Sequence, residues 1–428
     1  MATTTLFTDG LKELYHSQIE TQMNNDCVLK DALDESNKGI EVGGRGFYFP
    51  VKLTRGGAAG SIAEGAAVPP VGTNKSPSAR GHAIPSGEFV ANISLTSMVM
   101  AASKGGNKAA FVDALQNETE NAADELSRNF NRQLFGNKPA SQTTTFTSGV
   151  LARVTTGANS ASQTIKNGYA NHFYAGQRLL FGTAADLAAY PGVAGSVVTG
   201  VVQSVDSETG ITLVGAANTV TNDLITTGDA TFNSYSREMT GLDAIAKQDD
   251  DNLYEVDTGL NAGWRALVMG NGGDNRPMTR ELMDALGNNL KNTGGGQPDL
   301  VICHSSAQQE IVGTMTGDVR YMPLVFKGGY KRSALTWVFG NTDVGIVTDV
   351  HCPLRKVFAF QKAKLQLGYL KKFGWLDMDG AVLSRLSGVT TFGALYTAIA
   401  ELVCLQRNSV GVISDLQINT SNLVFGQS

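Results

Sequence analysis

The chain has 428 residues and a formal charge of −5, from 34 basic and 39 acidic side chains. A weakly acidic chain of this kind is not a polycation that binds nucleic acid through its phosphates. Charged residues make up 17% of the sequence, whereas about a quarter is usual in soluble proteins. This low charge suits a protein whose faces are covered by neighbouring subunits. The length allows two or three domains with buried cores.

The four cysteines, Cys27, Cys303, Cys352 and Cys404, are widely spaced and form no CxxC pair. They predict free thiols in a reducing cytosol rather than a disulfide framework. The N-terminus lacks the basic and apolar regions of a signal peptide. No run of about 18 apolar residues is present, so we expect no membrane association.

The N-terminal region predicts a helix on an arm. Residues 8–23 carry apolar side chains at helical spacing, which indicates a short amphipathic helix. The stretch 24–46 is polar and ends in a glycine-rich run. We therefore expect the helix to lie at the end of an extended arm.

Two segments with alternating apolar and polar side chains, 47–54 and 89–96, predict half-buried strands. The sequence between them, 55–87, consists mostly of Gly, Ala, Pro, Ser and isolated charges. We expect the two strands to pair as an antiparallel ribbon with a long tip. Such a tip has too few apolar side chains to order itself. The sequence thus predicts that another copy of the chain orders it.

A long helix is predicted over 107–135, and Gly136 and Pro139 end it. Its apolar stripe consists of Phe111, Leu115, Ala122, Leu126, Phe130 and Leu134. At 1.5 Å per residue the helix should be about 40 Å long. That length is typical of a strut rather than of a helix wrapped by a small core.

The composition changes over 146–236 to Thr, Gly, Val, Ala and Ser, with few charges. Residues 196–205 and 211–214 flank a turn at 207–210 and predict a hairpin. Residues 177–181 predict another strand. We interpret this region as a small all-β domain inserted into a host fold.

The remaining sequence mixes helices and strands. Thr279 is expected to cap a helix that Gly294 and Pro298 end, and Ser305 to open another. The predicted strands cover 300–303, 356–360, 364–370 and 395–405, with the last continuing as 410–413. This order of elements predicts an α+β host with one β insertion.

The sequence contains no phosphate-binding loop, dinucleotide-binding glycine motif, nucleophile elbow or HExxH motif. Cys303-His304 and His351-Cys352 are the pairs that suggest a zinc site or a cysteine nucleophile. Adjacent residues in a strand point to opposite faces, which favours a buried Cys beside an exposed His in each pair.

The acidic clusters at 249–251 and 377–379 lack the spacing of a calcium loop and are interpreted as solvated turns. We therefore predict no catalytic residue, no metal and no cofactor, and expect that the protein is not an enzyme.

Four basic residues, Lys52, Arg55, Lys75 and Arg80, lie in the ribbon and its tip. They lack the interleaved aromatic side chains with which proteins bind single-stranded nucleic acid. We expect them to form salt bridges to a neighbouring subunit.

The order of arm, ribbon, strut helix, α/β domain and long final strands resembles the major capsid protein of tailed double-stranded DNA phages, with the Hong Kong 97-type fold. Residues 47–100 resemble its E-loop, and 107–135 its spine helix in the P-domain. Residues 299–306 and 317–321 resemble the A-domain and the approach to its loop near the capsomer axis. Residues 395–416 resemble the closing P-domain strand.

The resemblance implies a division of the chain into six parts. These are an N-terminal arm (1–46), the E-loop ribbon (47–104), the P-domain spine helix (105–145), the inserted β domain (146–236), the A-domain (237–350) and the remaining P-domain and A-domain strands (351–428). The predicted assembly interface consists of Lys52, Arg55, Glu64, Lys75, Arg80, Arg320 and Tyr321.

The function implied by the resemblance is that of a structural shell protein. It would self-assemble into hexamers and pentamers of an icosahedral capsid that encloses double-stranded DNA without sequence-specific binding. The implied partners are other copies of the chain, a portal at one vertex, a decoration protein and a separate scaffolding protein. A separate scaffold is expected because too few residues precede the ribbon for a fused scaffolding domain. The location would be the virion, with assembly in the host cytoplasm.

Two alternatives remain open at this point. An encapsulin-type nanocompartment uses the same fold to enclose protein cargo instead of DNA. An enzyme working through Cys303 or His351 would lose activity on single substitution without a change in oligomeric state. Nothing in the sequence marks Lys52 or Lys75 for the lysine–asparagine crosslink of some capsids.

Overall fold

A computed structural model describes the protein at residues 27–33, 40–44, 46–53, 61–65, 78–96, 108–136, 149–166, 168–191, 197–248, 252–258, 261–315, 335–340, 342–376, 384–385 and 391–419. The chain forms two compact units. The smaller comprises Met1–Asn24, Ala91–Glu125 and Trp375–Tyr396, and the larger comprises Asn25–Val90, Leu126–Gly374 and Thr397–Ser428.

The larger unit contains a six-stranded mixed sheet in the order β13-β21-β17-β14-β16-β15. In that order the strands are Leu267–Met269, Gly411–Ile413, Val357–Phe360, Leu300–Cys303, Thr342–Thr348 and Leu335–Phe339. The helices α6 (Arg280–Asn292) and α7 (Ser305–Met315) pack on one face of the sheet, where they form a shared hydrophobic core. The predicted buried strand at 300–303 and both predicted helices are thereby confirmed.

Helix α6 begins where the sequence predicts. The hydroxyl of Thr279 accepts a hydrogen bond from the backbone N–H of Leu282 at 3.3 Å. This satisfies one of the N–H groups that the first turn of a helix leaves without a partner. On the buried face of α6, Met283, Leu286 and Leu290 are fully buried.

A closed β-barrel with the strand order β10-β5-β6-β9-β8-β7 occupies the middle of the sequence. Its strands are Leu224–Thr227, Val150–Thr156, Asn159–Ile165, Gly210–Asn218, Val198–Ser207 and Arg178–Gly182. The predicted hairpin is confirmed as β8 and β9, and the predicted strand at 177–181 as β7. Helix α4 (Ala184–Ala189) follows β7. Because the barrel closes on itself, it leaves no open sheet edge.

The predicted pairing of the ribbon is wrong. The first strands instead form a three-stranded sheet of β1 (Glu41–Gly43), β2 (Gly46–Lys52) and β3 (Ser78–Ala83). The partner of β2 is β3, which lies inside the sequence predicted to be a tip. The other predicted strand, β4 (Phe89–Thr96), pairs instead with β20 (Thr391–Cys404).

The prediction missed β3 because its inward side chains are very small. Ala79, Gly81 and Ala83 lie opposite Val51, Phe49 and Phe47 of β2. A Cβ atom on Gly81 would lie only 2.4 Å from the ring of Phe49. The large rings of β2 therefore fill the space on this face, and β3 shows no apolar alternation in its sequence.

The C-terminal strands also require a correction. β18 (Leu365–Trp375) and β19 (Ser384–Arg385) pair with β20. The segment expected to continue β20, β21, lies instead in the six-stranded sheet between β13 and β17. The short 3₁₀ turn Arg407–Ser409 separates the two strands. The apolar residues on both sides of this turn did not reveal the change of sheet.

The predicted long helix is confirmed as α3, which runs over Lys108–Leu134. Leu126, Phe130 and Leu134 of its stripe are buried. The Phe130 ring lies 5.0 Å from that of Phe89 and 5.3 Å from that of Phe373. The side chains of Phe111 and Leu115 lie outside the described part of the structure, as does the helix predicted at 8–23.

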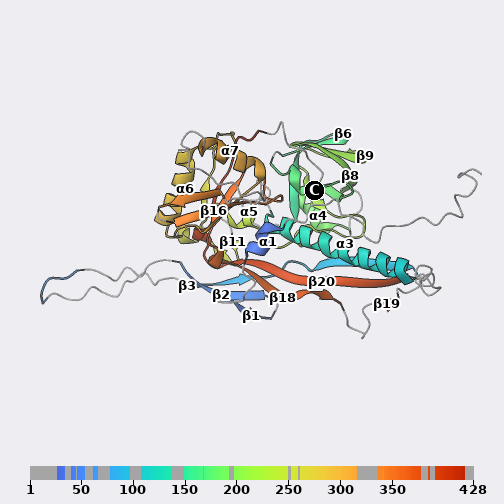
Figure 1. Ribbon diagram of the computed structural model, residues 1–428, viewed down its shortest axis with the longest axis horizontal. Helices are drawn as coiled ribbons and strands as arrows, with labels where there is room; N and C mark the ends of the chain where they lie inside the picture. The colour runs from blue at the N-terminus through green and yellow to red at the C-terminus, as the bar shows by residue number, and fades with distance from the viewer. Residues whose placement is uncertain are drawn as a thin grey trace, which may run out of the picture. The chain divides into compact units, whose positions relative to one another are not determined.

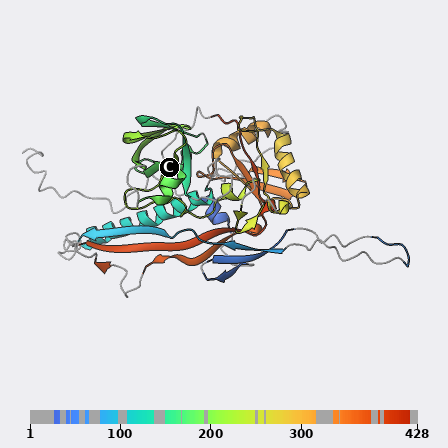
Figure 2. The ribbon, with the colours of Figure 1, turned by 180° about the vertical axis from the view of Figure 1, so that it is seen from behind.

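Helix α1 (Val28–Ala32) lies within the stretch predicted to be a polar arm. The side chain of Leu29 is completely buried, and those of Cys27, Leu33 and Ile40 are buried as well. Figures 1 and 2 show α1 between the barrel and the six-stranded sheet. This part of the arm thus belongs to the core of the larger unit.

The remaining elements are short: α5 (Leu242–Ile245), β11 (Asn252–Leu253), β12 (Val256–Asp257) and the 3₁₀ turns Ala170–His172, Ala262–Trp264 and Lys362–Lys364. Among the described helices, none combines the length and the apolar character needed to cross a membrane.

Candidate assembly interface and its anchors

Two of the predicted interface residues, Lys52 and Arg80, lie on one face of the sheet formed by β2 and β3. Directly paired residues point to the same face of a sheet. Lys52 pairs with Ser78, and Arg80 pairs with Pro50 two positions away along β2. Both basic side chains are exposed, so this face presents two positive charges to the solvent.

Aromatic stacking fixes the geometry of this basic face. The Arg80 guanidinium lies 3.8 Å from the centre of the Tyr48 ring. Tyr48 in turn stacks on His82 at 4.1 Å between ring centres and an interplanar angle of 10°. A cation–π contact at an exposed site contributes about 0.5–1 kcal/mol. The stack thus holds Arg80 flat against the sheet.

The other predicted interface residues are not brought to this face. Glu64 is exposed in a turn. Arg55, Lys75, Arg320 and Tyr321 lie outside the described residues. Their part in an interface therefore stays a prediction.

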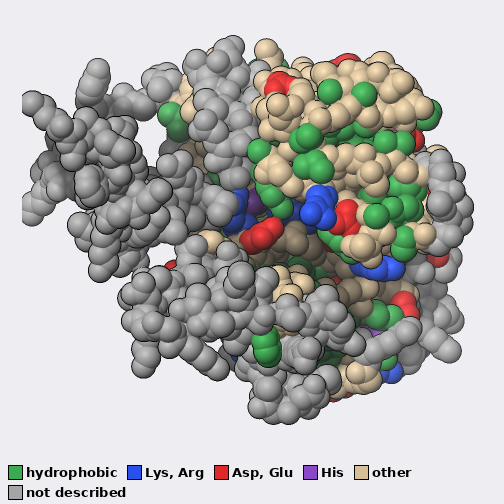
Figure 3. Space-filling model, turned by 90° about the vertical axis from the view of Figure 1, so that its right-hand side faces the viewer, with side chains coloured by type: hydrophobic (Ala, Val, Ile, Leu, Met, Phe, Trp, Pro, Cys, Tyr) green, Lys and Arg blue, Asp and Glu red, His purple; other side chains and the backbone are tan. Residues whose placement is uncertain are grey.

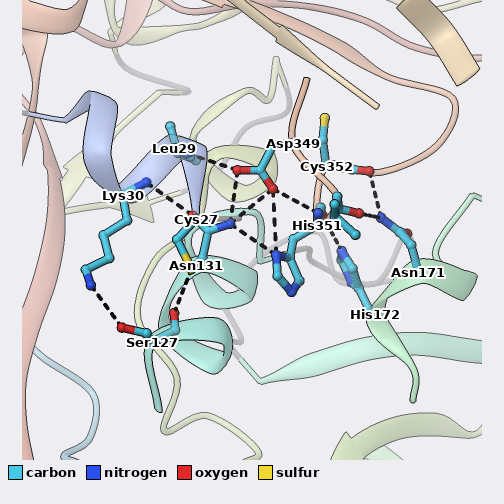
Figure 4. A network of polar contacts seen from close by, with 11 residues as sticks. Cys27, Leu29, Lys30, Ser127, Asn131, Asn171, His172, Asp349, His351 and Cys352 are labelled. Atoms are coloured by element: carbon cyan, nitrogen blue, oxygen red, sulfur yellow. Dashed lines mark hydrogen bonds and ion pairs between the residues drawn. The ribbon is translucent and has the colours of Figure 1, made fainter. Parts of the chain in front are cut away.

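A buried carboxylate, that of Asp349, anchors the N-terminal segment (Figure 4). Its Oδ2 accepts the backbone N–H of Leu29 at 3.0 Å. Its two oxygens also accept the side-chain amide of Asn131, each at 3.0 Å. The backbone N–H of His351 donates to Oδ1 at 2.9 Å. One side chain thus joins α1, α3 and the loop after β16.

The amide of Asn131 completes this anchor. Its Oδ1 accepts the backbone N–H of Lys30 at 3.1 Å, while its Nδ2 faces Nδ1 of His351 at 3.1 Å. Burial by itself would raise the pKa of Asp349, but hydrogen bonds from His351 and Asn131 hold it below its ordinary value. The carboxylate therefore remains charged and holds the first turn of α1 in place.

The same loop connects to the barrel region. The Asn171 side-chain amide donates to the backbone carbonyls of Val350 and Cys352, at 2.7 and 2.8 Å. The His172 Nε2 lies 2.9 Å from the carbonyl of His351. Burial lowers the pKa of His172 to about 3, so the ring is neutral and donates its Nε2–H to that carbonyl.

Three ion pairs with little solvent exposure connect further segments of the larger unit. Lys356 pairs with Asp243, whose other oxygen accepts the hydroxyl of Tyr169 at 3.3 Å. Burial opposes the charge of Lys356, but Asp243 and Tyr169 raise its pKa above its ordinary value. Arg355 bonds Glu208 of the β8–β9 turn, and Arg132 of α3 bonds Glu238 at 2.6 Å.

The cysteine–histidine pairs form no metal site among the described residues. All four cysteines are free and buried, which confirms the predicted thiols. The prediction of an exposed histidine in each pair is wrong, because His304 and His351 are 9% and 7% exposed. His304 turns its Nδ1 toward the Ser306 hydroxyl at 2.8 Å, and His351 joins the Asp349 anchor.

Glu401 on β20 is a buried acid that forms no ion pair with a described residue. Its Oε1 accepts the backbone N–H of Thr240 at 2.8 Å, while its Oε2 has no partner among the described residues. Burial raises the pKa of Glu401 to about 8. The side chain is therefore largely protonated at neutral pH and joins β20 to the segment before α5.

The barrel presents apolar side chains to the solvent. Val201, Val214, Val220 and Phe232 are exposed. Figure 3 shows hydrophobic side chains scattered over one side of the molecule, with several charged side chains near the centre of the view. Sequence reasoning identified the small, weakly charged character of this region but not the exposed residues.

A profile of the SU10 major capsid protein family matches residues 89–417, which is most of the chain. The chain belongs to the SU10 major capsid protein family. A search of the curated proteins finds no match.

Solved structures of phage and GTA capsids have a fold similar to that of this chain. The capsid asymmetric unit of cyanophage A-1(L) is similar with a TM-score of 0.60 and 14% identity, over 97% of this chain and 99% of that one. The capsid of the native GTA particle is similar with a TM-score of 0.52 and 9% identity, over 97% and 100%. The fold is thus the Hong Kong 97-type capsid fold.

An SU10-type major capsid protein is a structural protein of the phage virion that forms the capsid shell, and it is not an enzyme. The comparisons do not favour the nanocompartment alternative. The anchor residues Asp349 and Asn131 were missed by sequence reasoning. The one available signal was a polar residue beside the apolar stripe of α3.

Removing the Asp349 carboxylate should release α1. Asp349→Ala leaves the N–H of Leu29 and the amide of Asn131 buried without their acceptor. We expect a loss of roughly 3 kcal/mol in the free energy of unfolding, measured by chemical denaturation, and faster proteolysis at 27–33. Lys30→Ala is the control, because it removes the side-chain contacts of Lys30 with Ser127 and with the Phe373 ring but keeps the backbone N–H that bonds Asn131. Equal small losses in both variants would contradict the anchor.

Glu401 should make stability depend on pH. Its pKa is raised from 4.5 to about 8 in the folded chain, so its contribution is fully present below pH 4.5 and is lost as the pH rises through about 8. Relative to Glu401→Gln, the free energy of unfolding of the natural chain should fall by a few kcal/mol across this window. Denaturation curves at both ends measure it. A difference that stays constant with pH would refute the assignment.

Proposed function

We propose that this chain forms the hexamers and pentamers of an icosahedral phage capsid that encloses double-stranded DNA. The observation that carries the proposal is the family match over residues 89–417 on a capsid fold. The net charge of −5 supports a shell that encloses DNA without binding particular sequences.

We propose the same six-part division of the subunit that the sequence predicts. The β1–β3 sheet and β4 fall in the E-loop ribbon (47–104) or at its border. The barrel strands, from Val150 to Thr227, fall within the inserted domain (146–236). The six-stranded sheet combines the A-domain (237–350) with strands of the C-terminal part (351–428). The arm (1–46) and the spine helix (105–145) complete the division.

The basic face on β2 and β3 supports an intersubunit role for the E-loop. Lys52 and Arg80 are exposed there, and no described side chain forms an ion pair with either. We infer that they bind acidic side chains of a neighbouring copy. We propose that Arg55, Glu64, Lys75, Arg320 and Tyr321 contribute to the same interface between subunits.

The other partners that we propose for the subunit are a separate scaffolding protein, a portal at one vertex and a decoration protein. The exposed apolar side chains of the barrel support a decoration protein as the partner of that face. Four free, buried thiols support assembly in the reducing host cytoplasm.

Electron microscopy of the purified chain tests the assembly proposal. The chain is expressed alone and then together with neighbouring genes from its source. Rings, tubes or shells with six-fold units are expected, since intersubunit contacts bury on the order of 2,000–5,000 Å² in obligate assemblies. A dependence on co-expression would support an external scaffold. A small, uniform particle under every condition would overturn the proposal.

Shortening the sequence between β2 and β3 tests the E-loop. Replacing residues 56–75 with a short Gly-Ser linker keeps both strands of the hairpin. We expect a folded, soluble subunit with no detectable assembly by sedimentation, because the predicted intersubunit contacts are gone. A tip of equal length with its sequence scrambled controls for loop length. Normal assembly of the shortened chain would contradict the intersubunit role.

A further inference from the structure

The anchor that holds α1 contains a histidine ring with two possible partners (Figure 4). Nδ1 of His351 lies 3.1 Å from the amide nitrogen of Asn131 and 3.7 Å from Oδ1 of Asp349. The first distance is that of a hydrogen bond, and the second is slightly too long for one. Histidine is the side chain whose charge ordinarily changes between about pH 5 and 8. The protonation of this ring therefore decides which partner it can bind.

Other contacts fix the orientation of the Asn131 amide. Its Nδ2 donates to both oxygens of Asp349, and an ionised carboxylate can only accept. On its other side, Oδ1 accepts the backbone N–H of Lys30 at 3.1 Å. The group that faces His351 is thus an N–H donor, and Nδ1 can bond it only through its lone pair. The ring bound to Asn131 is therefore neutral and carries its proton on Nε2.

Protonation of the ring would remove this bond. A proton on Nδ1 would face the N–H of Asn131, and two donors cannot bond each other. The carboxylate of Asp349 is the acceptor within reach, and a charge-assisted bond from an imidazolium is strong. The ring would then compete with Asn131 for Asp349. A displaced Asn131 also loses the N–H of Lys30, one of the two backbone groups through which this anchor binds α1.

We propose that His351 is a pH-sensitive switch, and that protonation of its ring loosens α1 from the rest of the larger unit. The neutral ring keeps Asn131 in place between the carboxylate and α1. The charged ring takes the carboxylate for itself, so acid weakens the attachment of α1 and of the chain that leads into it. His351 is 7% exposed, so solvent protons can reach it. The inference goes beyond the proposed function, since it concerns the single subunit.

The other titratable groups packed against the joint keep their charge over this pH range. Hydrogen bonds hold the pKa of Asp349 below its ordinary value, so it stays ionised. Burial lowers the pKa of His172 to about 3, so that ring stays neutral. Burial also raises the pKa of the Cys27 thiol to about 11 and that of Cys352 above its ordinary value, so both stay protonated.

The charged side chains on the surrounding elements do not replace His351 in this role. They are Lys30 and Asp31 on α1, Arg128 and Arg132 on α3, and the Lys356–Asp243 pair. None of these is a histidine. A change of charge in the joint between about pH 5 and 8 is therefore assigned to His351.

Hydrogen exchange of the full, unassembled chain, measured by mass spectrometry, tests the switch. Protection of residues 27–33 is expressed relative to an unstructured peptide at the same pH. It should fall about tenfold in the natural chain between about pH 8 and 5, because α1 loses a hydrogen bond. The α6 segment, 280–292, is the internal reference and should keep its protection. Glu401 stabilises the fold as the pH falls, so it cannot cause this loss.

His351→Asn removes the titrating ring and keeps an acceptor. The side-chain oxygen of asparagine stands two bonds from Cβ, as Nδ1 of histidine does, so it can accept from Asn131 at any pH. Protection of 27–33 should then be the same at both pH values.

His172→Gln is the matched control at the other buried histidine of the joint. The amide nitrogen of glutamine stands three bonds from Cβ, as Nε2 of histidine does, so it can still donate to the carbonyl of His351. This variant should keep the tenfold loss of the natural chain.

The outcomes decide between the switch and its alternatives. Loss of protection in the natural chain and in His172→Gln, but not in His351→Asn, supports the switch. Equal loss in a folded His351→Asn shows that another group titrates and overturns it. Constant protection of 27–33 in the natural chain overturns it without any variant, and so does a parallel loss at 280–292, which would indicate global unfolding. None of these results depends on assembly, so failure of the switch leaves the proposed capsid role intact.

Discussion

The larger unit depends on one buried carboxylate that has to be satisfied by hydrogen bonds. Asp349 is 1% exposed and receives donors from Leu29, Asn131 and His351. A buried charge is costly unless such donors surround it. Each donor comes from a different segment of the chain, so satisfying the carboxylate fixes α1 and the end of α3 on the loop after β16. The completely buried side chain of Leu29 adds an apolar contact to this polar joint.

Buried polar ties also determine where the barrel sits within the larger unit. Asn171 and His172 bond the loop that contains Asp349, and Glu208 bonds Arg355 next to that loop. Such pairs add little net stability because desolvation opposes their attraction. They do penalise other arrangements, since a displaced barrel would leave charges buried without partners.

The candidate contact surface on β2 and β3 is basic. It holds Lys52 and the Arg80–Tyr48–His82 stack, which suits an acidic partner surface. Added salt should weaken a contact through this face, because salt screens the attraction between exposed charges.

The sequence by itself determined the elements whose signals are local. The stripe of α3, the Thr279 cap, the β8–β9 hairpin and the buried β14 all follow from periodicity or from neighbouring residues. The type of fold followed from the resemblance of the order of these elements to that of a known family. The tertiary structure alone decided which strands pair and which polar residues are buried. β3 was not predicted because its inward residues are Gly81 and two alanines, which leave room for the rings of β2 and give no apolar alternation in the sequence. Asn131 meets Asp349 and His351 only after folding, because hydrogen bonds between residues about two hundred positions apart leave no pattern in the sequence.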